Sequence, residues 1–378
     1  MSIVIPNELQ SVLSAEKDNI KCEQASGKTA AIFTWCNNNG PTNYGQILQC
    51  YAVQHILEGF GYTVKVVYYR KKDSRDIRKK YHSNKTAEGR SNNINYEKNF
   101  QKQLEGEELG RFHMFNSFVE NYIHLSAPCY SKRMVELEIQ DCDLLVCGSD
   151  QIWNPAWTNE VLLLNIGKKH QKRVAFAPSG IFVDDKYTND FLSERKEWFD
   201  RFEVITVREK CGAKILQKHV KKQVGTCPDP TLCLSRQEWD EIAAPGEQKE
   251  KYIFCYFIGS VRPYQLMIKE VARKHHVKAI YTIPSNINRE PTYSFMEKIE
   301  DAGPAEFLSL MKNATAVCTD SFHGLVFSHI YGKKVYCMTR SEGGPDRIGR
   351  TARLVNLESE YGIKLNMVKN CHDVYKEG

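Results

Sequence analysis

Alternating strand and helix patterns limit the folds open to this chain more than any other feature of its sequence. The opening strand, helix and strand patterns fall at residues 30–35, 44–58 and 62–68. Three later apolar runs, at 144–147, 174–177 and 204–207, do not alternate strictly between apolar and polar residues. Such runs are typical of parallel strands that are covered on both faces. The sequence therefore predicts an α/β fold with parallel sheets.

Two domains are expected, because 378 residues are too many for one ordinary core. A second alternating series begins after the polar stretch 235–251, which we interpret as a linker. The predicted domains are residues 1–240, with a basic and helical insertion around 70–125, and residues 250–378. The other predicted helices are 191–199, 209–218, 264–274 and 304–313, and the other predicted strands are 252–258, 278–283, 315–318 and 334–338.

The composition is that of a soluble globular protein, with 42% hydrophobic and 26% charged residues. No apolar run approaches the ~20 residues that cross a bilayer, and residues 1–21 lack the apolar core of a signal peptide, so we expect a cytoplasmic protein. Thirteen cysteines without a Cys-x-x-Cys pair favour reduced thiols over disulfides or structural zinc. No His, Asp and Glu cluster has metal-ligand spacing, so no metal is expected.

Residues 70–90 form the most basic segment, with nine Lys or Arg against three acidic residues. The net charge of the whole chain is only +6, so this is a local patch. One interpretation is a solvated insertion, and the other is attraction to an anionic membrane surface or to a lipid-diphosphate acceptor. Nucleic-acid binding is not expected, because no recognised binding module accompanies the charge.

Two titratable residues directly follow strands, at the edge where open α/β sheets bind ligands. The run 316–324 ends in Ser-Phe-His-Gly and leads into a helical pattern. His323 therefore lies at a strand-to-helix turn and is a candidate catalytic or phosphate-binding group, with a capping role as the alternative. Arg208 follows another strand and is a candidate for binding an anionic ligand. The alternative is an ion pair with Glu209 or Asp200.

Four motifs lie in order along the chain. They are Thr-Asn-Tyr-Gly-Gln-Ile-Leu-Gln at 42–49, Gly-Ser-Asp-Gln-Ile-Trp-Asn at 148–154, Gly-Pro-Ala-Glu-Phe-Leu at 303–308 and Thr-Asp-Ser-Phe-His-Gly at 319–324. In this order and at these separations they resemble the polysaccharide pyruvyl transferase family, and the resemblance extends from about residue 32 to residue 357.

The resemblance implies two facing Rossmann-like domains with parallel sheets, similar to GT-B glycosyltransferases, and an active site in the interdomain cleft. It implies that pyruvate passes from phosphoenolpyruvate to two hydroxyls of a sugar in a surface or capsular polysaccharide precursor. The product is a cyclic ketal, phosphate is released, and no cofactor takes part. The acceptor would be a sugar or a lipid-linked oligosaccharide. Peripheral contact to the cytoplasmic face of the inner membrane would follow from the second interpretation of the basic segment 70–90.

The resemblance also assigns a donor site. His323 matches the family histidine, which would protonate the enol or stabilise the departing phosphate. Arg208 would contact the donor together with Ser321 and Gly324. The chain departs from the pattern at Ser321, where some relatives carry a donor-binding arginine. Either another cation replaces that arginine, or the donor binds in a different pose. The candidate cations are Arg262, Arg347 and Arg350.

Acceptor binding is expected at the ends of the first-domain motifs. Asp150 could hydrogen-bond to an acceptor hydroxyl or deprotonate it, or it could cap the turn that follows it. The backbone amides of Asn43, Tyr44 and Gly45 begin the first helix and could take an anion or a sugar oxygen, although Gly45 could simply allow close packing. Trp153 could stack on a sugar ring or belong to the core.

Two other functions stay open at the level of sequence. A nucleotide-sugar glycosyltransferase would share the two-domain architecture, although no carboxylate for a donor ribose can be assigned. A non-catalytic sugar-binding relative is favoured by Ser321 and opposed by His323 and Arg208. The chain also stops where family members often continue with a closing helix, so its end is either naturally short or missing a piece.

Overall fold

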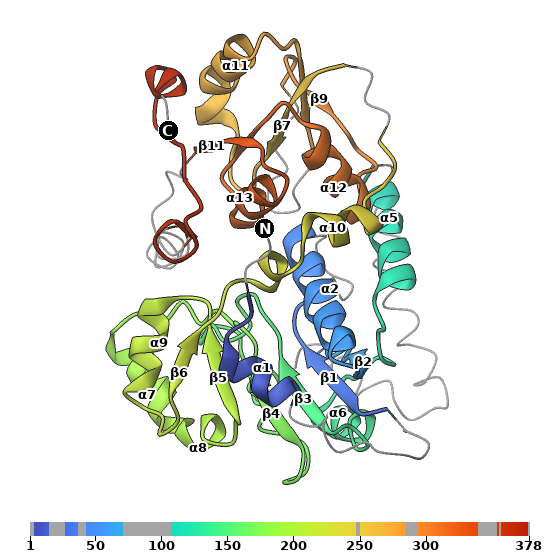
Figure 1. Cartoon of the computed structure of the whole chain (residues 1–378), viewed down its shortest axis with the longest axis vertical. Coiled ribbons are helices and arrows are strands. Elements are labelled where there is room, and N and C mark those ends of the chain that lie inside the picture. Colours follow the sequence, from blue (N-terminus) through green and yellow to red (C-terminus); the bar gives the residue numbers. More distant parts are fainter. Residues whose placement is uncertain are drawn as a thin grey trace, which may run out of the picture.

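Two six-stranded sheets organise the computed structural model, which describes residues 4–14, 27–36, 43–70, 107–246, 250–283, 293–338, 354 and 357–376 (Figure 1). The first sheet has the order β2-β1-β3-β4-β5-β6 and the second has the order β12-β11-β10-β7-β8-β9. The strands of the first sheet are β1 (Thr29–Phe33), β2 (Thr63–Val66), β3 (Leu144–Cys147), β4 (Lys172–Ala175), β5 (Val204–Val207) and β6 (Val224–Thr226). Those of the second are β7 (Tyr252–Tyr256), β8 (Ala279–Thr282), β9 (Glu297–Lys298), β10 (Ala316–Thr319), β11 (Lys334–Met338) and β12 (Met367–Val368).

Helices surround both sheets (Figure 1). Those that accompany the first sheet are α1 (Asn7–Ser14), α2 (Tyr44–Gly59), α5 (Glu107–Tyr122), α6 (Lys132–Glu138), α7 (Lys186–Glu194), α8 (Lys196–Phe199) and α9 (Lys210–Gln217). The crossover to the second sheet contains the short 3-10 helix η3 (Pro230–Cys233) and α10 (Arg236–Ile242). The rest are η4 (Arg262–Tyr264), α11 (Gln265–Lys274), α12 (Pro304–Asn313), α13 (Phe322–Ile330) and η5 (Cys371–Tyr375).

The parallel α/β fold with two Rossmann-like domains is confirmed. Every strand pair within the described residues is parallel. All four side chains of β3 and all four of β10 are buried. Burial on both faces explains why these strands read as continuous apolar runs.

The elements differ from the sequence prediction in three ways. The stretch 235–251, predicted as a linker, contains helix α10, which Ser235 and Glu238 start with a reciprocal capping box. The single helix predicted at 191–199 is two helices that meet at Arg195. Strands β6, β9 and β12 have only two or three residues and are too short to leave a pattern in the sequence.

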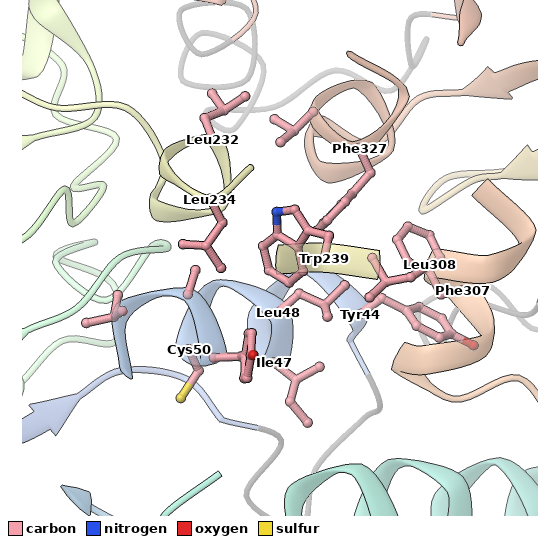
Figure 2. Packing of buried hydrophobic residues seen from close by; sticks show 14 of the residues in the cluster. Tyr44, Ile47, Leu48, Cys50, Leu232, Leu234, Trp239, Phe307, Leu308 and Phe327 are labelled. Atoms are coloured by element: carbon pink, nitrogen blue, oxygen red, sulfur yellow. The ribbon is translucent and has the colours of Figure 1, made fainter. Parts of the chain in front are cut away.

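One apolar cluster joins the two domains. Figure 2 shows Leu48 of α2 and Phe327 of α13 near Trp239 of α10, and Tyr44 of α2 beside Phe307 of α12. The rings of Tyr44 and Phe307 are stacked at 5.0 Å, and the rings of Trp239 and Phe327 lie 5.0 Å apart. A large apolar interface of this kind limits the relative motion of the two domains.

The region of the predicted insertion at 70–125 is described only in part. Its helix α5 lies beside α12 of the second domain (Figure 1), and Phe115 of α5 contacts the Tyr44 ring at 4.8 Å. The basic segment 70–90, apart from Arg70, lies outside the described residues.

Candidate functional site

A buried carboxylate connects the carboxyl ends of the two sheets. Asp229 follows β6 and begins η3, and its side chain is fully buried. Its Oδ2 forms a salt bridge of 2.8 Å with Nη2 of Arg208, the residue that follows β5. The same Oδ2 lies 3.4 Å from Nε2 of His323 in α13. Two residues predicted independently, one from each domain, therefore meet at a single oxygen atom.

The charge of Asp229 is set by these partners. Burial alone would raise the pKa of its carboxyl, but Arg208 and His323 outweigh burial and hold that pKa well below its usual range. The second oxygen, Oδ1, accepts hydrogen bonds from the backbone N–H and the hydroxyl of Thr231, at 3.0 and 2.7 Å. The carboxylate is consequently ionised and fixed in orientation.

Arg208 connects three strand ends. Its Nη2 donates to the hydroxyl of Ser149 at 2.6 Å, and that hydroxyl donates to the carbonyl of Ala177 at 2.8 Å. The Arg208 backbone N–H also donates to the carbonyl of Pro178. Its guanidinium lies 5.0 Å from the centre of the Phe322 ring, at the start of α13. The structure therefore gives Arg208 an ion-pair partner that the sequence analysis did not name, Asp229.

His323 is the second residue of α13 and is buried, so it belongs to the helix and not to an exposed turn. Ser321 is the N-cap of that helix, and its hydroxyl accepts a hydrogen bond from the N–H of Gly324 at 3.3 Å. On its other side the imidazole packs against Gly45 in the first turn of α2. A Cβ atom at position 45 would overlap the ring. Gly45 thus provides the close packing that was its alternative role.

The backbone is strained beside this network. Asp150 and Ala177, which follow β3 and β4, have φ angles of 66° and 55°. This left-handed region costs a residue with a side chain roughly 1–2 kcal/mol. The conformation is held by a hydrogen bond of 2.7 Å from the Ser179 N–H to the Asp150 carbonyl. Strain of this kind accumulates at functional sites, and it directs the chain after Ser149 across the strand ends.

Two predicted acceptor residues lie in the core. Trp153 has no exposed surface and meets the rings of Phe199 and Phe202 at 5.2 and 5.7 Å, so the prediction that its ring stacks on a sugar is wrong. The Tyr44 side chain is also buried, and its hydroxyl donates to the carbonyl of Ala302 at 2.7 Å. Asn43 caps α2 by accepting a hydrogen bond from the N–H of Gln46.

Of the three cations predicted to replace an arginine at Ser321, only Arg262 lies within the described residues. Arg347 and Arg350 lie outside the described residues. Arg262 begins η4, and its backbone N–H donates to the hydroxyl of Ser260 at 3.1 Å. The structure adds Asp320 to this end of the second sheet, since its carboxylate accepts the N–H groups of Ile258 and Gly259 at 2.7 Å each.

Asp229 and Ser149 are the site residues that the sequence analysis missed. The run Pro-Asp-Pro-Thr at 228–231 is a typical start for a short helix or turn, and it was a usable signal. Strand β6, which precedes it, is only three residues long and leaves no strand pattern in the sequence. Ser149 lies in the second motif, directly before Asp150.

The cysteines of the described residues are free thiols. Cys147 and Cys255 are fully buried in strands, and burial raises the pKa of their thiols well above the usual value. Such thiols are poor nucleophiles. No group of three or more His, Cys, Asp or Glu side chains within the described part of the chain is arranged to hold a metal ion. None of the described helices combines the length and apolar character needed to cross a membrane.

A family model for polysaccharide pyruvyl transferase matches residues 43–342 of the chain. Among solved structures, S. aureus MnaA with UDP is 13% identical with a TM-score of 0.49, over 92% of this chain and 86% of that one. UDP-GlcNAc 2-epimerase from Methanocaldococcus jannaschii is also 13% identical, with a TM-score of 0.47, over 92% of this chain and 90% of that one. A search of curated proteins found no match.

Proposed function

The chain belongs to the polysaccharide pyruvyl transferase family, and from this premise we propose that it transfers pyruvate from phosphoenolpyruvate to two hydroxyls of one sugar. The product is a cyclic ketal on a surface or capsular polysaccharide precursor, and inorganic phosphate leaves. The observation that carries the proposal is the meeting of Arg208 and His323 at Asp229, because it brings a guanidinium and an imidazole from the two domains together where strands of each sheet end.

Phosphoenolpyruvate carries a phosphate and a carboxylate, and both need cations or backbone amides. Arg208 offers the planar guanidinium that binds such anions through paired hydrogen bonds. The guanidinium lies next to Phe322, where α13 begins, and the positive end of a helix adds further attraction for an anion. The donor anion would share Arg208 with Asp229 and Ser149.

The reaction needs only proton transfers and charge stabilisation, so we propose that it uses no metal or organic cofactor. Carbon 3 of the enol gains a proton, and carbon 2 bonds to the first hydroxyl oxygen, which loses its proton. The second hydroxyl oxygen then bonds to carbon 2, the bond to the phosphate oxygen breaks, and the proton of that hydroxyl leaves with the phosphate. In this scheme His323 either protonates carbon 3 or steadies the phosphate, and Asp150 accepts the first hydroxyl proton.

The test supplies phosphoenolpyruvate and a panel of glycan acceptors, lipid-linked ones included, to the purified protein. Phosphate release should match the formation of an acid-labile ketal, followed through its methyl signal in NMR. His323→Ala should lower turnover at least ~100-fold, the usual cost of losing a positioned acid or base. Arg208→Lys should raise KM for phosphoenolpyruvate, because lysine cannot form the planar fork.

His372→Ala removes an exposed histidine and serves as the control that should keep full activity. If the protein instead consumed a nucleotide sugar and formed a glycosidic bond without any ketal, it would be a glycosyltransferase and the proposal would fail. We further propose that the basic segment 70–90 brings lipid-linked acceptors near through attraction to anionic lipid. Vesicle binding that weakens with salt is the expected result.

A further inference from the structure

Exposed aromatic rings gather at one loop of the first domain. Among the described residues, three large aromatic side chains are strongly exposed: Trp157 at 45%, Tyr187 at 62% and Tyr375 at 49%. Trp157 and Tyr187 both hydrogen-bond to the loop 151–155, although they are thirty residues apart in sequence. Tyr375 lies in η5 of the second domain and bonds to Glu270.

This loop leads directly out of the Asp229 site. The indole Nε1 of Trp157 donates to the carbonyl of Gln151 at 2.8 Å. Gln151 is two residues beyond Ser149, whose hydroxyl binds Arg208. Consecutive Cα atoms are 3.8 Å apart at most, so the Gln151 carbonyl lies within about 10 Å of the Ser149 Cα. A glycan with one sugar at the reacting centre could therefore reach Trp157 with that sugar or the next one.

The two rings are held by their polar atoms while 45% of Trp157 and 62% of Tyr187 stay exposed. Trp157 is tied through its indole N–H, and the Tyr187 hydroxyl donates to the carbonyl of Pro155 at 3.3 Å. The loop itself is anchored, since the Trp153 side chain is buried and the Trp153 backbone N–H donates to the Ser179 carbonyl. Rigid aromatic rings with one polar tie provide contact area at a low cost in conformational entropy.

We propose that Trp157 and Tyr187, here called the aromatic platform, bind the acceptor glycan by stacking on the C–H faces of its sugar rings. The ligand class is an oligosaccharide, and its reacting sugar lies toward Asp150. This inference rests on the proposed function, because it names where that function takes its acceptor. It also transfers the stacking role predicted for the buried Trp153 to an exposed tryptophan on the same loop.

The test measures binding of a glycan panel made of lipid-free hexose and N-acetylhexosamine oligosaccharides. The double variant Trp157→Ala, Tyr187→Ala should bind at least about tenfold more weakly, which equals about 1.4 kcal/mol. Tyr375→Ala removes an equally exposed tyrosine and should bind like the wild type. Tyr187→Phe keeps the ring without the hydroxyl tie and should retain most of the affinity.

Two further readouts separate a platform from a merely structural loop. Bound glycan should shield Trp157 from acrylamide quenching of tryptophan fluorescence, and the shielding should vanish in Trp157→Ala. The affinity for phosphoenolpyruvate, measured by thermal shift, should stay unchanged in the double variant, because Ser149 and Arg208 are intact. A loss of donor affinity equal to the loss of glycan affinity would show a general collapse of the loop and would overturn the proposal.

The outcomes also separate this inference from the proposed function. If the platform variants lost glycan binding while the wild type bound glycans but formed no ketal, the platform would stand and pyruvyl transfer would fail. If ketal formed with the same KM for the glycan in wild type and double variant, pyruvyl transfer would stand and the platform would be wrong. Failure of every glycan in the panel to bind the wild type would likewise overturn the platform.

Discussion

Asp229 is fully buried, and contacts from Arg208, His323 and Thr231 occupy both of its carboxylate oxygens. A buried charge is tolerated only when its partners replace the hydration that it loses. Removal of that charge would leave the buried Arg208 guanidinium without the carboxylate that pairs with it. At the scale of single residues, the carboxylate therefore supports both the stability of the site and the orientation of the groups proposed to act on the donor.

Asp229→Asn keeps the shape of the side chain and removes its charge. We expect it to lower the free energy of unfolding at pH 7 by about 3–5 kcal/mol, the cost of breaking a buried ion pair. Chemical denaturation measures this directly. Asp190→Asn, at an exposed carboxylate, is the matched control and should be nearly neutral. A similar small effect at both positions would mean that the Asp229 pair adds nothing.

The pH dependence of wild-type stability follows from the lowered pKa of Asp229. A carboxyl whose folded-state pKa is depressed stabilises the fold above its unfolded pKa of about 3.9, and this contribution is lost as the pH falls toward the folded value. Wild-type stability should therefore decline below about pH 4 more steeply than that of Asp229→Asn. Unfolding curves at several pH values would reveal parallel slopes if the carboxylate had an ordinary pKa.

The first turns of α2 and α13 approach each other at Gly45 and His323. This contact brings an element of the first domain against the proposed catalytic residue of the second. A glycine in a helix costs about 0.5–1 kcal/mol relative to alanine, so its use here reflects the close approach and not helix propensity. At the scale of elements, the position of the imidazole is set by the packing of two helices from different domains.

Gly45→Ala should displace the imidazole and lower turnover by about 100-fold, while the fold is kept. Gly59→Ala lies in the last turn of the same helix, where a Cβ would meet open space, and it should leave activity unchanged. Steady-state kinetics and circular dichroism of both variants check this pair. Wild-type activity in Gly45→Ala would show that the imidazole position is unimportant.

The domains share an apolar interface in which the α10 side chain Trp239 is completely buried. Its indole N–H donates to the carbonyl of Thr231 at 3.1 Å, which links the interface to η3 and so to Asp229. A continuous core of this kind couples the unfolding of the two halves. At the scale of the whole molecule, we expect a rigid pair of domains that unfolds as one unit.

Trp239→Ala should reduce the free energy of unfolding by about 3–5 kcal/mol, the usual cost of truncating a buried tryptophan. Leu266→Ala, at a side chain 70% exposed in α11, is the control and should change stability little. Calorimetry should give one cooperative transition for the wild type and a lower melting temperature for Trp239→Ala. Two well-separated transitions in the wild type would contradict a shared core.

The sequence alone determined the features that depend on local pattern. The predicted bounds of β3, β5, α12 and β11 agree with the structure, because each is a clear apolar run or a well-started helix. Arg208 and His323 could be chosen from the sequence because each follows a strand, where ligand-binding residues of α/β sheets occur.

Only the tertiary structure decided how these elements meet. The partner of Arg208, the fit of Gly45 against His323 and the exchange of Trp153 for Trp157 as the exposed ring all depend on long-range packing. Burial and contact between separate segments of the chain leave no periodic trace in the sequence. The physical reason is that local propensity fixes strands and helices, whereas the site arises from side chains that approach only after both domains have packed.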